Sequence, residues 1–170
     1  MCLAIVADSP VIGASSGRIR ANRDPKPGEL YEFSKRSFAK LHELARGQSM
    51  AIVRTAAELR AARAAQPAVI VTSEGGDWLD GKIERLDEAY QRWQLRQLQL
   101  THYRPNELGD IQTEPSVRGG LTDFGAEVIR RCNALGIVVS VEVPEGALPV
   151  LRRLSAAAEA RDVSAANDQE

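Results

Sequence analysis

Two residues of this chain stand where enzymes built on parallel sheets place their reactive groups. Glu74 follows the apolar run 68–72 and precedes Gly75 and Gly76, and His102 follows the run 95–100. The carboxyl ends of neighbouring parallel strands meet at one edge of a sheet, where ligands bind. A carboxylate and an imidazole at that edge could ligate a metal ion, move a proton or polarise a carbonyl.

Both residues also have a purely structural interpretation. Glu74 could cap the next helix or face water, and His102 could be a loop histidine bonded to a backbone carbonyl. The second histidine, His42, lies inside an amphipathic helical stretch and is expected on the helix surface. The strand-end pattern therefore selects Glu74 and His102 as candidates without deciding what they do.

A glycine-rich motif at 119–125 has a structural explanation that needs no catalysis. The two glycines end a loop, and Thr122 is a helix N-cap because its hydroxyl can accept a hydrogen bond from a free amide of the first turn. The loop at 102–119 is long and polar, so its side chains are expected either in solvent or at a pocket rim. These polar residues are Arg104, Asn106, Glu107, Asp110, Gln112 and Glu114.

Strands and helices alternate along the chain in an order that can build such an edge. Apolar runs predict strands at 2–7, 50–53, 68–72, 95–100 and 137–141. The run 68–72 is almost continuously apolar, which predicts that helices cover both faces of this strand. Periodic patterns predict helices at 29–46, 55–65, 80–93 and 122–135, and 8–28 reads as a loop. This alternation predicts an α/β fold with a parallel sheet and right-handed crossovers. A closed (β/α)8 barrel takes ~250 residues, so the sheet is either small and open or about half of a barrel.

Composition excludes several classes of function. The 170 residues carry a net charge of −1 with acids and bases interspersed, so we expect neither a nucleic-acid nor a membrane partner. Two cysteines and no signal-peptide pattern predict a cytoplasmic protein, with Cys132 an inert buried thiol. Trp78 and Trp93 are expected to pack in the core. Phosphate-loop, Cys-x-x-Cys, His-Glu-x-x-His and Gly-x-Ser-x-Gly motifs are absent from the sequence.

Taken in order, the motifs resemble the membrane (renal) dipeptidases, the zinc-dependent enzymes of peptidase family M19. The resemblance runs from about residue 50 to 139 and rests on 73–76, 100–102, 119–125 and 131–136. It implies a TIM (β/α)8 barrel of the metallo-dependent hydrolase type and hydrolysis of a dipeptide by water shared between two zinc ions. It also implies that Glu74 is the bridging metal ligand and that His102 binds substrate and stabilises the tetrahedral intermediate.

The sequence departs from that family at the other metal ligands. It contains no His-x-Asp, and Ser140 begins a stretch where the family continues with Asp-x-x-His. We therefore assign no catalytic residue, and predict weak or absent zinc binding and no dipeptidase activity for this chain alone. The expected organisation is a partial barrel over 1–143 and a divergent helix with a frayed tail over 144–170, as in a truncated or frame-shifted product.

Two other interpretations remain open at this stage. The first is a non-catalytic α/β interaction module, or pseudoenzyme, whose free sheet edge pairs with a second copy or with a missing barrel half. The second is an active barrel assembled from separate chains. A zinc titration with a dipeptide assay distinguishes an enzyme from a module.

Overall fold

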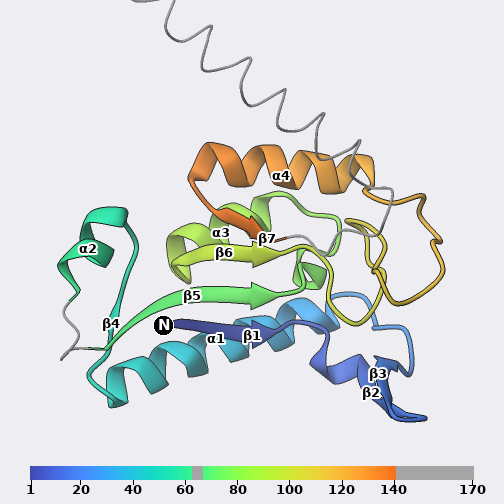
Figure 1. The fold of residues 1–170 in the computed structure, drawn as a ribbon, viewed down its shortest axis with the longest axis horizontal. Helices are drawn as coiled ribbons and strands as arrows, with labels where there is room; N and C mark the ends of the chain where they lie inside the picture. The colour runs from blue at the N-terminus through green and yellow to red at the C-terminus, as the bar shows by residue number, and fades with distance from the viewer. Residues whose placement is uncertain (63–66, 141–170) are drawn as a thin grey trace, which may run out of the picture.

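Five strands form one parallel sheet in a computed structural model that describes residues 1–62 and 67–140. The order of neighbouring strands is β1 (Cys2–Val6), β5 (Ala68–Glu74), β6 (Leu95–Gln99) and β7 (Val138–Ser140). Figure 1 shows these four strands side by side. The short strand β4 (Ala51–Ile52) pairs in parallel with the first residues of β5. Because every strand of this sheet runs in the same direction, the carboxyl ends of β1, β5 and β6 meet at one edge.

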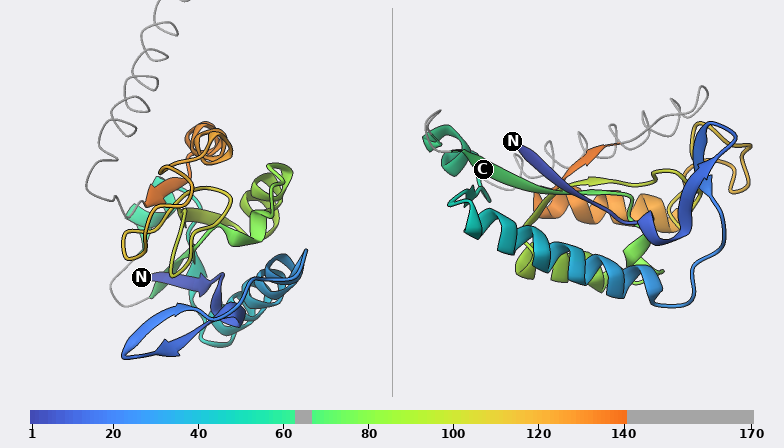
Figure 2. Two further views of the ribbon diagram at one scale, coloured as in Figure 1. Left: turned by 90° about the vertical axis from the view of Figure 1, so that its right-hand side faces the viewer. Right: turned by 90° about the horizontal axis from the view of Figure 1, so that it is seen from below.

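The main helices lie on a single face of the sheet. They are α1 (Glu29–Gly47), α3 (Glu84–Arg92) and α4 (Asp123–Leu135), and α2 (Ala56–Ala61) lies at one end (Figure 2). The prediction that helices cover both faces of the run 68–72 is wrong. The path from β1 through β5 and β6 to β7 follows the order of these strands in the chain, and right-handed crossovers between strands in such an order place their helices on the same side. This is the winding of an arc of a barrel.

The predicted helix ends are set by local hydrogen bonds. Thr55 and Glu58 form the reciprocal capping box at the start of α2. The Thr122 hydroxyl accepts a hydrogen bond from the Gly125 amide at 3.0 Å, and Gly136 ends α4 in the left-handed conformation. These contacts confirm the structural interpretation of the 119–125 motif.

Two elements differ from the prediction because of left-handed turns. The expected loop at 8–28 contains a hairpin of β2 (Ile12–Ser15) and β3 (Arg18–Ala21), closed by Ser16 and Gly17 with φ of 50° and 76°. The helix expected from residue 80 begins only at Glu84. Asp80 and Gly81 have φ of 50° and 71°, which separates α3 from a short 3-10 turn, Asp77–Leu79.

One aromatic cluster packs α1 against the 3-10 turn after β5 and the end of α3. Phe38 of α1 stacks on Trp93 with ring centroids 4.6 Å apart, and both rings contact Trp78 edge-on at about 6 Å. All three side chains are buried, which confirms Trp78 and Trp93 as packing residues. In the described part of the chain, no helix combines the length and the apolar character needed to cross a membrane. The predicted helix and tail at 144–170 lie outside the described residues.

Candidate active site

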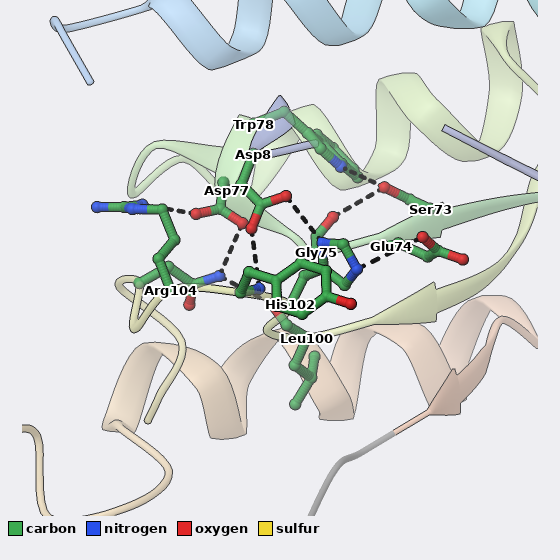
Figure 3. Close-up of polar contacts among 11 residues, drawn as sticks. Asp8, Ser73, Glu74, Gly75, Asp77, Trp78, Leu100, His102 and Arg104 are labelled. Atoms are coloured by element: carbon green, nitrogen blue, oxygen red, sulfur yellow. Dashed lines mark hydrogen bonds and ion pairs between the residues drawn. The ribbon is translucent and has the colours of Figure 1, made fainter. Parts of the chain in front are cut away.

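Glu74 and His102 meet at the carboxyl edge of the sheet. Glu74 is the last residue of β5, and His102 follows the end of the neighbouring strand β6. The His102 Nε2 atom lies 3.5 Å from Glu74 Oε2, and Figure 3 shows the two side chains facing each other. The Glu74 side chain is 44% exposed and that of His102 is 13% exposed, so the pair opens to solvent on the glutamate side. Their assignments as metal ligand and substrate-binding residue stay predictions.

A third residue, Asp8, completes this arrangement and was not selected from the sequence. It lies two residues after the end of β1 and is fully buried. One carboxylate oxygen lies 2.8 Å from His102 Nδ1, and the other accepts a hydrogen bond from the Tyr103 amide at 2.9 Å (Figure 3). The signal that could have found Asp8 is the one that found Glu74, a carboxylate at the end of an apolar strand.

Gly75 lets these three side chains approach one another. Its φ of 87° is left-handed, and a Cβ atom there would lie 2.7 Å from Asp77 Oδ2 and 3.5 Å from the Cβ of His102. The next amide, of Gly76, donates to the Leu100 carbonyl at 2.9 Å and so joins the ends of the two strands. The glycines after Glu74 are therefore required by the backbone turn and by the lack of space.

Asp77 is a second buried carboxylate, behind the histidine. Arg104 donates to it at 2.6 Å and the Asn106 side-chain amide at 3.2 Å. Burial raises the pKa of Asp77 to about 6, although the charge and hydrogen bond of Arg104 act in the opposite direction. Asn106 also donates to the Leu100 carbonyl at 2.9 Å, so this network fixes the loop that begins at His102.

The loop at 102–119 is largely buried up to residue 111 and mostly exposed after it, and Asp110 connects the two parts. Asp110 is buried and accepts hydrogen bonds from the Ser116 hydroxyl at 2.7 Å and the Gly120 amide at 2.8 Å, with two more from the amides of Val117 and Arg118. Burial acts to raise the pKa of Asp110, but these donors together lower it to about 2. Of the two expected environments, solvent is therefore excluded for Asn106 and Asp110, which are buried and hold the loop together.

A small cavity of about 70 Å³ lies between the start of α1 and the loop at 102–119, where Asp77 forms part of its wall. Its polar wall includes Asp77, Arg104 and Arg118, and Tyr31 of α1 contributes an aromatic side. The expectation of a pocket rim therefore holds for part of the loop. Neither Glu74 nor His102 lines this cavity.

The donors at the sheet edge do not make a two-zinc site. A structural or catalytic zinc ion takes three or four protein ligands. The Asp8 carboxylate is buried and accepts hydrogen bonds from two N–H donors, whereas Glu74 is partly exposed. Over residues 1–62 and 67–140, no group of three or more His, Cys, Asp or Glu side chains could hold a metal ion. The described residues thus supply fewer ligands than such a centre needs.

Comparisons with known proteins agree with the geometry. The family described as membrane dipeptidase (peptidase family M19) matches residues 34–144, more than half of the chain. The search of curated proteins found no match to this chain. Among solved structures, dipeptidase AC, a metallopeptidase of family M19, superposes with a TM-score of 0.66 at 20% identity over 82% of this chain.

Two structures from Pseudomonas aeruginosa are also similar. An amidohydrolase has a TM-score of 0.59 at 19% identity over 68% of this chain, and the probable dipeptidase PvdM has 0.60 at 19% identity over 71%. Of these structures' own chains, the match covers 42% for dipeptidase AC, 35% for the amidohydrolase and 33% for PvdM. This confirms the predicted fold class, a parallel α/β arrangement that forms part of a barrel.

Proposed function

Because the chain belongs to the membrane dipeptidase family, peptidase family M19, we propose that Glu74 and His102 form one part of a dipeptidase active site. The observation that carries the proposal is the 3.5 Å approach of His102 Nε2 to Glu74 Oε2 at the carboxyl edge of the sheet. Glu74 is the metal-binding carboxylate of this partial site, and His102 contacts the dipeptide.

The chemistry of the histidine follows from where its Nε2 atom lies. An imidazole nitrogen at a solvent-accessible edge can hydrogen-bond the carbonyl of a bound peptide, and in its protonated form it favours an oxyanion there. Peptide hydrolysis also requires an activated water molecule. The described donors are too few to complete a zinc centre, so we assign no hydrolytic step to this chain alone.

Two measurements on the purified full chain test the proposal. L-alanyl-L-alanine at millimolar concentration should shift the side-chain NMR signals of His102 and leave those of His42 in place, because His42 lies on α1 and contacts Trp93. Elemental analysis after zinc loading should give less than one zinc per chain, without dipeptide turnover. Unmoved His102 signals would contradict the partial site.

Stoichiometric zinc and turnover would contradict the proposed inactivity. In that case Glu74→Gln should abolish both, whereas Glu43→Gln, an exposed carboxylate on α1, should leave both unchanged. This matched pair separates the loss of a ligand from the loss of a surface charge.

A non-catalytic interaction module is the second candidate, and the free edge of the sheet favours it. Within the described ranges β1 pairs only with β5, and its residues Cys2–Val6 include no charge, glycine or proline that would oppose further pairing. A groove beside this strand is lined by Phe33, Leu41 and Leu44 of α1. Analytical ultracentrifugation would reveal a dimer if the edge pairs with a second copy, and a monomer at high concentration would weigh against self-association.

A further inference from the structure

The contacts of Asp8 determine which nitrogen of His102 carries its proton. A carboxylate only accepts hydrogen bonds. Asp8 faces His102 Nδ1 at 2.8 Å and the Tyr103 amide at 2.9 Å, so both of its oxygens act as acceptors. We infer that Asp8 is a positioning residue that fixes His102 as the Nδ1–H tautomer and directs Nε2 toward Glu74.

The backbone holds Asp8 rigidly enough for this role. Immediately before it, the Ala7 amide donates to the Glu74 carbonyl at 2.9 Å, and the Asp8 carbonyl accepts from the Val11 amide at 2.9 Å. Its side chain has no exposure to solvent, which leaves no water to compete for the two bonds. Asp8 therefore connects the end of β1 to the loop after β6, across the end of β5.

The hydrogen bond from Nδ1 to Asp8 also fixes the orientation of the His102 ring, and with it the direction of the Nε2 atom. In the neutral ring the closer contact, 2.8 Å to Asp8, holds the proton on Nδ1 and leaves the lone pair on Nε2. Protonation of Nε2 would turn its 3.5 Å approach to Glu74 into an ion pair. The use of this nitrogen to contact a dipeptide rests on the proposed function, whereas the tautomer itself does not. Carboxylates orient the catalytic histidine of Ser-His-Asp triads in the same way.

The substitution Asp8→Asn tests the inference because it keeps the shape and changes the acceptors. An asparagine has only one oxygen to accept hydrogen bonds, and the Tyr103 amide is a fixed donor. The amide oxygen should therefore turn to Tyr103 and the NH2 group should donate to His102 Nδ1. This exchange moves the imidazole proton to Nε2.

The chain provides its own spectroscopic reference, because it contains only two histidines. The Nε2 atom of His42 lies 2.8 Å from the Trp93 carbonyl, which only accepts, so neutral His42 must be the Nε2–H tautomer. Long-range proton–nitrogen correlation spectra of the 15N-labelled full chain, taken up to pH 9, distinguish the two forms. His42→Gln assigns the signals.

We expect the wild-type chain to show one histidine of each tautomer. Asp8→Asn should convert only His102 to Nε2–H and should reduce its response to L-alanyl-L-alanine. Asp87→Asn is the control, a carboxylate on α3 that pairs with Arg131 of α4. It should leave both tautomers unchanged.

Several outcomes would overturn the inference. Two Nε2–H histidines in the wild type would do so without any variant, and so would a His102 ring still doubly protonated at pH 9. Asp8→Asn that folds and keeps the Nδ1–H form would also contradict it. If the tautomers are as expected but the dipeptide shifts no signal, the proposed function fails and the role of Asp8 stands.

Discussion

The buried carboxylate of Asp77 should make the stability of this protein depend on pH in an unusual direction. Burial raises the pKa of Asp77 from 3.8 to about 6, with Arg104 opposing the rise. The folded state therefore binds a proton more tightly than the unfolded chain does. Stability from this group is fully present below pH 4 and is lost as the pH rises through about 6.

The size of the effect follows from the two pKa values. Each tenfold change in proton affinity is worth about 1.4 kcal/mol, so the full difference is about 3 kcal/mol. Between pH 7 and pH 5 the free energy of unfolding should rise by about 1 kcal/mol from Asp77, and by about 2 kcal/mol at pH 4. Asp77→Asn removes the titrating group. The ion pair with Arg104 exists only where Asp77 is ionised, so its loss is already part of this pH dependence.

Urea unfolding of the wild type and of Asp77→Asn between pH 4 and pH 7 measures this difference. The wild type should gain stability relative to the variant as the pH falls. Asp110→Asn provides the control, because hydrogen bonds lower the pKa of Asp110 to about 2 despite its burial. Asp110 is ionised in folded and unfolded chains from pH 5 to 7, so its difference from wild type should stay constant. A constant or falling difference for Asp77 would refute the reasoning.

Three further outcomes can be measured on the same protein. Gly125→Ala should lower Tm and cost about 1–3 kcal/mol, since the new Cβ would lie 2.1 Å from a backbone carbonyl oxygen. Gly47→Ala is its control, with open space and ordinary backbone in α1, and should raise stability by about 0.5–1 kcal/mol. Thr122→Ala removes the N-cap of α4 and should cost about 1 kcal/mol in urea unfolding. A thiol reagent at pH 8 should modify the exposed Cys2 quickly and the buried Cys132 only on unfolding, because burial raises the pKa of Cys132 to about 12. Fast modification of both cysteines in the folded protein would contradict this.

Local signals in the sequence were enough to predict most of the helices and strands and to select two residues of the candidate site. The capping box at Thr55 and the cap at Thr122 involve residues three positions apart, so the sequence contains both partners. Glu74 and His102 were found because each follows an apolar strand, and parallel strands end at a common edge. The hairpin between β2 and β3 was missed because its turn depends on left-handed backbone at Ser16, which residue type does not dictate.

Only the tertiary structure decided what surrounds those two residues. Asp8 and His102 are separated by 94 positions and meet because β1 pairs directly with β5, a register that no local pattern specifies. The position of every main helix on one face likewise depends on the strand order rather than on any one segment. Local sequence determines which segments form strands and which groups end them. The pairing of distant strands determines which of these strand-end side chains meet, as Asp8 and His102 do in their hydrogen bond.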